Sequence, residues 1–253
     1  MLGAGTKGCS MNTIEIKTID DLITGIRNLI SQNNLKTWFR GQADKDWDLI
    51  PAAKRPPFTG QEQFLTNDFY IKAKNRMKNP PQKGDYSGWL SLMQHYGLPT
   101  RLLDWSKSPL IAAYFAIWNY KKYPEKDACI WAMHPSILNR YEDFGDYLYP
   151  MDNNSVIKLL IPAFKTVKTT DKVIACWSVE NDLRMFVQQA AFTVHDSNVP
   201  LNKMGVNNLL TRFIIPRNLK QKFLHDLAIC GFLLSDIFPD IESVSFELKN
   251  SHK

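Results

Sequence analysis

Residues 93–106 read MQHYGLPTRLLDWS, and they join two predicted helices with no flexible spacer between them. The helix expected over residues 87–96 ends at Gly97, which suits a helix C-terminal cap. The next helix begins at Ser108-Pro109, because serine favours the N-cap and proline the first helical position. Free N–H groups at such a helix start attract anions. The density of polar groups in this stretch favours a ligand site over a purely structural corner.

The chain before this stretch is mainly helical, and the chain after it is richer in strands. Apolar residues recur at helical spacing over 19–30, 61–77 and 110–118, while 35–41 is a short aromatic strand and 43–60 a loop. Because helices lead and strands follow without strict alternation, we predict an α+β single domain. Its N-terminal helices pack on a mixed, mostly antiparallel sheet. The later strands are expected over 128–133, 156–161, 173–177, 186–194 and 211–215, and the final helices over 219–230 and 241–248.

Composition is that of an ordinary globular chain. The 253 residues are 44% hydrophobic and 22% charged, which argues against a disordered or fibrous protein. The net charge of +6 permits phosphate-bearing partners, but no run of five like charges forms a basic arm. The longest apolar run, residues 110–118, is shorter than the ~20 residues of a membrane-spanning helix, so we expect no membrane partner.

The cysteines and histidines indicate whether the chain has a metal site and in which cellular compartment it lies. The four cysteines form no Cys-x-x-Cys pair and the five histidines no His-x-x-x-His pair, so we expect no metal site. Free thiols within apolar runs are typical of the reducing cytoplasm, and the first ten residues lack a secretion signal. We therefore expect a cytoplasmic protein. Residues 1–10 are predicted to be a disordered extension before a natural start at Met11, with one domain over 11–253.

The first candidate site segment is Trp38-Phe39-Arg40-Gly41-Gln42. Arg40 ends a predicted strand, and its guanidinium can hold a phosphate or a carboxylate in a bidentate manner. Gly41 leaves room for a ligand to approach the backbone. The alternative interpretation is an Arg40 side chain that forms an ion pair with a nearby carboxylate.

The second segment is the stretch over 93–106, in which His95 is a candidate base and Asp104 a candidate charged group. The alternative is a rigid corner in which Arg101 pairs with Asp104 while His95 lies in the core. Further hydrogen-bond donors come from Thr100, Ser106 and Ser108.

The third segment is residues 181–193, predicted to be a strand from residue 186 onward. Along a strand Gln188, Ala190 and Phe192 share a face, so Gln188 beside a small residue can reach into a cleft. The alternative is a glutamine that faces water.

These segments together resemble the FRG-domain family, which is named for the motif that is here Phe39-Arg40-Gly41. The stretch over 93–106, the Arg184…Gln188…Phe192 segment and Phe238-Pro239-Asp240 fit the same pattern, so the resemblance extends over about residues 19–244. The family occurs in bacteria and phages. The resemblance implies a bacterial toxin or phage-defence role.

The order of the motifs is more distantly similar to that of ADP-ribosyltransferases, which implies a split sheet and NAD as substrate. Those enzymes hold NAD with an Arg-Gly pair on an early strand, then use a Ser-Thr-Ser segment before a helix and a Glu on a late strand. The similar positions here are Arg40-Gly41, Asp104-Trp105-Ser106 and Gln188-x-Ala190. Because glutamine carries no negative charge, Asp104, His95 or the reserve candidate Glu180 would have to take the role of the late Glu. The alternative is a nucleotide that binds without turnover.

We accordingly predict an NAD-using ADP-ribosyltransferase or NAD glycohydrolase with a protein or nucleic-acid target. The alternatives are a non-catalytic nucleotide-sensing module and, less favoured because no groove-reading motif occurs, a nucleic-acid-binding protein. An aromatic ring such as Tyr96 or Trp105 would stack on the nicotinamide. The predicted catalytic residues are Arg40, His95, Asp104 and Gln188. The predicted ligand-binding residues are Gly41, Gln42, Tyr96, Thr100, Arg101, Trp105, Ser106, Ser108 and Arg184.

Overall fold

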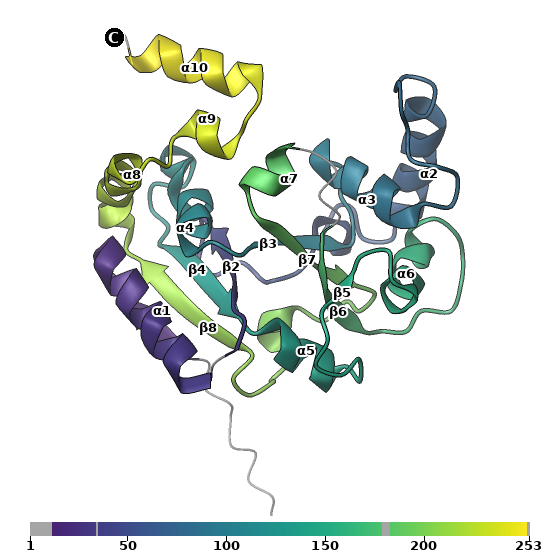
Figure 1. The fold of residues 1–253 in the computed structure, drawn as a ribbon, viewed down its shortest axis with the longest axis horizontal. Coiled ribbons are helices and arrows are strands. Elements are labelled where there is room, and N and C mark those ends of the chain that lie inside the picture. Colours follow the sequence, from purple (N-terminus) through teal and green to yellow (C-terminus); the bar gives the residue numbers. More distant parts are fainter. Residues whose placement is uncertain (1–11, 34, 179–182, 252–253) are drawn as a thin grey trace, which may run out of the picture.

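The centre of the molecule is a mixed eight-stranded sheet, seen in a computed structural model that describes residues 12–33, 35–178 and 183–251 (Figure 1). The strands lie in the order β1-β8-β4-β2-β3-β7-β6-β5. Among the strands of the described residues, the edge pairs β1–β8 and β5–β6 are parallel and the other neighbouring pairs are antiparallel. The predicted extension over 1–10 lies outside the described residues. The strands are β1 (Asn12–Glu15), β2 (Trp38–Gln42), β3 (Leu102–Ser106), β4 (Ala128–Met133), β5 (Tyr149–Pro150), β6 (Val173–Trp177), β7 (Ala190–His195) and β8 (Leu210–Ile215).

Helices cover both faces of this sheet, and the α+β prediction is confirmed. On one face, α1, α4 and α8 pack over the half formed by β1, β8, β4 and β2, while α3 and α6 pack over the other half. The opposite face carries α5 and a tryptophan-rich cluster, which includes Trp38, Trp105 and Trp131. The helices are α1 (Ile19–Asn33), α2 (Glu62–Ala73), α3 (Tyr86–His95), α4 (Pro109–Ile117), α5 (Pro135–Tyr141), α6 (Asn154–Leu160), α7 (Leu183–Val187), α8 (Lys220–Ile229), α9 (Leu234–Ile237) and α10 (Ile241–Ser251).

Local capping signals set the helix starts that the sequence predicted. The Thr18 hydroxyl accepts from Asp21 N at 3.1 Å, and the Asp21 carboxylate accepts from Thr18 N at 3.0 Å, which is the reciprocal pattern of a capping box. Ser108 caps α4 by accepting from Ile111 N at 3.4 Å, with Pro109 in the first turn.

Two predicted strands are wrong. Residues 156–160 lie in α6 instead, because Asn153 caps a helix by accepting from Ser155 N at 2.9 Å, and Ile161 begins a 3-10 turn. The strand predicted over 186–194 is also too long. It begins only at Ala190, since α7 precedes it and Gln189 adopts a left-handed φ of 49° that turns the chain.

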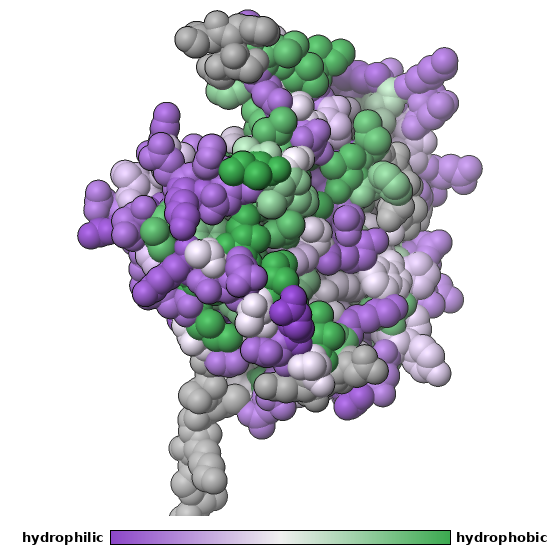
Figure 2. Space-filling view, turned by 60° about the vertical axis from the view of Figure 1, so that its left-hand side comes forward, coloured by the Kyte–Doolittle hydropathy of each residue, from purple (hydrophilic) through white to green (hydrophobic). Residues whose placement is uncertain are grey.

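The C-terminal helices α9 and α10 lie at one end of the molecule, beyond the sheet (Figure 1). Figure 2 shows hydrophobic side chains gathered toward this end, where Ile241 and Phe246 of α10 are exposed. In the described part of the chain, none of the helices combines the length and the apolar composition that a bilayer crossing requires.

The sheet is nearly divided between β2 and β3. These strands share the single pair Phe39–Ser106, whereas β2 with β4 and β3 with β7 each share five pairs. The strands part after Phe39, so the backbone groups of Arg40 and Gly41 have no ladder partner on β3. This opening separates the two halves of the sheet and sets the place of the site.

Gly41 is required at the edge of this opening by the packing of α4. A Cβ on this residue would lie 2.0 Å from Ala112 O and 2.5 Å from Ala116 N, both backbone atoms of α4. The space that the sequence analysis assigned to a ligand is therefore filled by a helix. The missing side chain lets α4 approach β2 closely.

We expect Gly41→Ala to lower the free energy of unfolding by about 3 kcal/mol, because α4 must move off the sheet. The control is Gly60→Ala, where a Cβ meets nothing within 4 Å but φ is +79°, and where we expect about 1 kcal/mol. Urea denaturation of both variants measures the difference. Equal losses would contradict the packing role of Gly41.

Candidate functional site

A cavity of about 250 Å³ lies where β2 and β3 part. Its wall is built from both halves of the sheet and from α3, α4 and α7, so no single element forms it. Eight of the predicted site residues line it: Arg40, Gly41, His95, Asp104, Trp105, Ser106, Arg184 and Gln188. The other lining residues are Phe39, Ser91, Gln94, Ala112, Phe115, Met185, Ala190 and Phe192.

The guanidinium of Arg40 bridges the opening between the two half-sheets. Its Nη1 donates to Asp104 O at 2.6 Å and lies 3.8 Å from Asp104 Oδ2. Its Nε is buried and has no hydrogen-bond partner among the described residues. Burial lowers the pKa of Arg40, the Asp104 carboxylate acts in the opposite direction, and the like charge of Arg55 lowers the pKa further. Arg40 is thus a mostly buried cation whose Nε–H group has no protein partner among the described residues.

Asp104 presents a carboxylate at the other side of the opening. Its side chain is 52% exposed, and Oδ2 accepts from Gln94 Nε2 at 2.7 Å. Gln94 is oriented in turn by the Thr100 hydroxyl, which donates to its Oε1 at 2.5 Å. A chain of three polar side chains therefore fixes where the Asp104 charge lies.

The remaining cavity residues come from α3 and from the α7–β7 turn. His95 ends α3 and lines the cavity beside the exposed ring of Tyr96. Gln188 precedes β7, and its Nε2 donates to Ile237 O at 3.0 Å, so its amide is tied to α9. The Ser106 hydroxyl donates to Gln188 O at 2.8 Å. Glu180, the reserve candidate, lies outside the described residues.

Four predicted ligand-binding residues lie around the cavity but do not line it. Gln42 accepts from Trp131 Nε1 at 2.7 Å in the core, and Tyr96 is 63% exposed. Thr100 acts on Gln94, and Ser108 caps α4. These four side chains support the wall or its neighbouring elements.

Trp105 packs away from the side of the sheet that carries Asp104. Its indole is 2% exposed within the tryptophan-rich cluster, and Nε1 donates to Thr193 Oγ1 at 3.1 Å. Successive side chains of a strand point to opposite faces, so neighbouring Asp104 and Trp105 part in this way. The ring is therefore not placed to stack on a ligand beside the Asp104 carboxylate, as the sequence analysis proposed.

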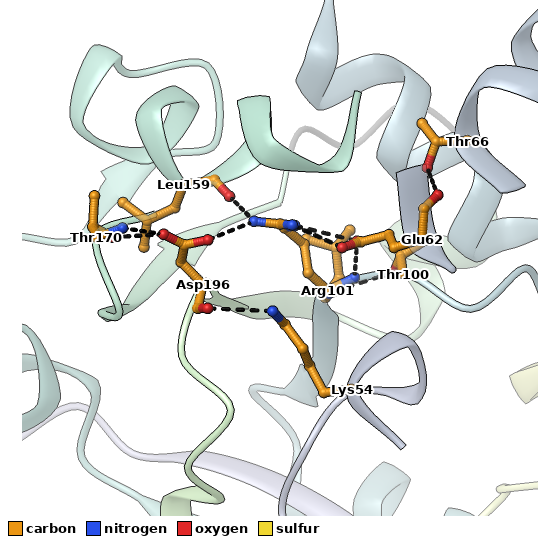
Figure 3. Close-up of polar contacts among 9 residues, drawn as sticks. Lys54, Glu62, Thr66, Thr100, Arg101, Leu159, Thr170 and Asp196 are labelled. Atoms are coloured by element: carbon orange, nitrogen blue, oxygen red, sulfur yellow. Dashed lines mark hydrogen bonds and ion pairs between the residues drawn. The ribbon is translucent and has the colours of Figure 1, made fainter. Parts of the chain in front are cut away.

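Arg101 also lies away from the cavity, in a buried network of charges (Figure 3). Its Nη2 donates to Glu62 Oε2 at 2.8 Å, and its Nη1 to Asp196 Oδ1 at 3.0 Å and to Leu159 O at 2.7 Å. Lys54 Nζ donates to Asp196 O at 3.2 Å on the same side. The alternative interpretation, in which Arg101 pairs with Asp104, is wrong, because the guanidinium pairs with Glu62 and Asp196.

Sequence reasoning missed Gln94 and the apolar wall. Gln94 stands directly before His95 in the quoted stretch. It lies one helical turn after Ser91, and this spacing could have indicated that the two side chains share the helix face that lines the cavity. Phe115 and Met185 read as ordinary core residues, because nothing in their local pattern distinguishes a cavity wall from a filled core. Across the described ranges, no group of three or more His, Cys, Asp or Glu side chains gathers as metal ligands do.

These features define an α+β protein with a small cavity, lined by both polar and apolar side chains, between two half-sheets. Residues 35–125 match the family model described as the FRG domain, so this part of the chain is an FRG domain. The match confirms the family resemblance and includes Arg40 and Asp104, while α7 and β7 lie beyond it. Comparisons with curated proteins and with solved structures found no match. The more distant similarity to ADP-ribosyltransferases stays a prediction.

We expect Arg101→Leu to lower the free energy of unfolding by about 3–5 kcal/mol, because it leaves Glu62 and Asp196 buried without their cation. Arg140→Leu is the control. It removes an exposed ion pair with Asp146 and should cost less than about 1 kcal/mol. Denaturation followed by circular dichroism compares the two variants, and similar losses would argue against a structural role for the Arg101 network.

Proposed function

We propose that the cavity binds a nucleotide of the NAD class and that the chain cleaves the bond between its nicotinamide and ribose. The observation that carries this proposal is the approach of Arg40 and Asp104 from opposite half-sheets into one cavity. A guanidinium with unused donors suits the pyrophosphate of the nucleotide. A carboxylate nearby suits the positive charge that develops on the ribose.

The reaction needs no metal or redox partner. The bond from ribose C1′ to the nicotinamide nitrogen breaks, and its electron pair leaves with the nicotinamide, which becomes neutral. The Asp104 carboxylate would stabilise the positive charge left on the ribose. Water or a target nucleophile then attacks C1′ and loses its proton to solvent or to a base, for which His95 is the candidate in the cavity wall.

The apolar part of the wall fits a flat heteroaromatic ring. Phe115 of α4 and Phe192 of β7 line the cavity together with Met185 and Ala190. Ligand sites commonly combine such apolar walls with a few polar groups that fix orientation. A cavity of about 250 Å³ suits the nicotinamide end of a dinucleotide, with the rest of the ligand extending past Arg40.

Loss of NAD, or modification of a target by ADP-ribose, is the chemistry that a toxin or phage-defence protein would use in the bacterial cytoplasm. The free buried thiols of Cys129 and Cys176 suit that reducing compartment. A protein or nucleic-acid target would supply the nucleophile in place of water.

We expect the purified protein to release nicotinamide from labelled NAD in the presence of a bacterial lysate. Arg40→Ala and Asp104→Asn should each lower the rate at least about 100-fold, since each removes charge complementarity to the transition state. Matched controls are Arg27→Ala and Asp20→Asn, which change exposed residues of α1. Chromatography of nicotinamide measures the rate, and wild-type rates in the Arg40 and Asp104 variants would contradict the assignment.

The second candidate function is a nucleotide sensor without turnover, and the contact between Gln188 and Ile237 favours it. Gln188 stands where the similar enzymes carry a catalytic Glu, and its amide instead donates to Ile237 O at the end of α9. This hydrogen bond couples the cavity wall to the C-terminal helices. A bound nucleotide would act on α9 through it.

For a sensor, we expect NAD at a hundredfold excess over Kd to stabilise the native state by about 2.7 kcal/mol while remaining intact. Thermal unfolding with and without NAD measures the stabilisation, and chromatography afterwards measures NAD integrity. Stabilisation accompanied by release of nicotinamide would exclude the sensor and support the enzyme. An unchanged unfolding temperature would contradict both.

A further inference from the structure

Three residues that line the cavity contact the end of α9. Ile237 O accepts from Gln188 Nε2 at 3.0 Å. The ring of the next residue, Phe238, meets the Phe115 ring edge to face, with 5.6 Å between the centroids and 88° between the planes. The guanidinium carbon of Arg184 lies 5.1 Å from the centroid of the same Phe238 ring. Because Gln188, Phe115 and Arg184 come from different parts of the chain, the end of α9 joins them behind the cavity wall.

The end of α9 is itself held by the core of the protein. The Ile237 side chain is 2% exposed and belongs to the apolar cluster that packs α1, α4 and α8 on the sheet. Phe238 N donates to Leu234 O at 2.8 Å, and the Phe238 ring also packs against Trp118, with 5.4 Å between the centroids. The Phe238 ring therefore has a fixed place from which it can order its neighbours.

Arg184 gains from such a support because an arginine side chain has many rotamers. Ordering that side chain costs conformational entropy, and a support that orders it before the ligand arrives removes this cost from binding. An aromatic ring attracts a guanidinium through its quadrupole. Stacking uses the flat face of the guanidinium and leaves the N–H groups, which lie in its plane, able to donate. Arg184 can thus stack on Phe238 and still offer donors to the cavity that it lines.

We propose that Phe238 is a positioning residue, which holds Arg184 in the cavity wall so that its guanidinium binds the negatively charged part of a nucleotide. Phe238 is not among the described residues that line the cavity, so it acts through Arg184 and not on the ligand. The identity of the nucleotide rests on the proposed function. The positioning does not depend on cleavage, because it concerns binding alone.

The alternative role for Phe238 is that of an apolar filler between α4 and α7. Two substitutions separate the roles. Leucine keeps an apolar side chain at this place but has no π face, whereas tyrosine keeps the ring and its face. A filler tolerates leucine, and a support for a cation does not.

Isothermal titration calorimetry with ADP-ribose provides the test, because this ligand keeps the pyrophosphate and has no nicotinamide to lose. We expect Phe238→Leu to weaken binding about 5- to 10-fold through loss of the cation–π contact, and Phe238→Tyr to bind within about twofold of wild type. The matched control is Tyr141→Leu, which removes a 55% exposed ring of α5 on the opposite face of the sheet and should leave the affinity unchanged.

A double-mutant cycle shows whether Phe238 acts through Arg184. Arg184→Gln removes the cation and should weaken ADP-ribose binding about 10- to 100-fold. If Phe238 works by holding Arg184, adding Phe238→Leu to Arg184→Gln weakens binding by less than about twofold more. Two independent effects would instead multiply.

Circular dichroism verifies that each variant is folded before binding is compared. If Phe238→Leu does not fold, Phe238→Met carries the test, because methionine is flexible enough to fill an irregular space and also has no π face. We expect Phe238→Met to bind ADP-ribose more weakly than Phe238→Tyr.

Three outcomes overturn the proposal: unchanged affinity in Phe238→Leu, an equal loss in Phe238→Tyr, and losses that multiply in the double variant. Wild-type protein that does not bind ADP-ribose overturns it as well. Intact NAD together with ADP-ribose binding that depends on Phe238 through Arg184 would refute cleavage and leave the positioning role standing. Nicotinamide release by a protein whose ADP-ribose affinity is independent of Phe238 would do the reverse.

Discussion

The guanidinium of Arg101 joins parts of the chain that are far apart in sequence, and the start of β3 depends on it. Glu62 of α2 accepts from both its side chain and its backbone N–H, the latter at 2.7 Å, and Asp196 follows directly after β7. Burying three charged groups carries a large desolvation cost, which is offset only when the geometry is complete. Here the Arg101 guanidinium has partners on all three nitrogens, including Leu159 O in α6.

The position of the cavity follows from this anchor and from one close helix contact. Asp104 lies three residues after Arg101 along β3, so the network fixes the strand that carries the carboxylate. On the other half-sheet, the approach of α4 to Gly41 fixes the strand that carries Arg40. The two halves of the sheet share a single residue pair between β2 and β3. The distance between Arg40 and Asp104 therefore depends on the relative position of the two halves.

Local sequence signals predicted where helices start and that the polar stretch over 93–106 contributes to a site. They could not predict which residues, far apart in the sequence, contact one another. Ser108 and Pro109 fixed the start of α4, and the polar stretch before them does contribute to the cavity. The local sequence around Arg101 and Arg40 does not show that the two arginines have different contacts. Only the fold reveals that Arg101 meets carboxylates 39 and 95 positions away. The face on which Trp105 packs likewise depends on strand pairing with β7, which no local pattern encodes.

Arg101 and Arg40 differ in how far their hydrogen-bond donors are satisfied by the protein. Arg101 is 4% exposed, and each of its three guanidinium nitrogens donates to a protein oxygen, which gives it a structural role. Arg40, Arg55 and Arg212 each keep a buried Nε without a partner in the described structure. Folding alone would favour satisfying these donors, because each unpaired group lowers stability. Arg40 differs from Arg55 and Arg212 because it lines the cavity, so its place in the fold, and not the partnerless Nε by itself, points to a ligand.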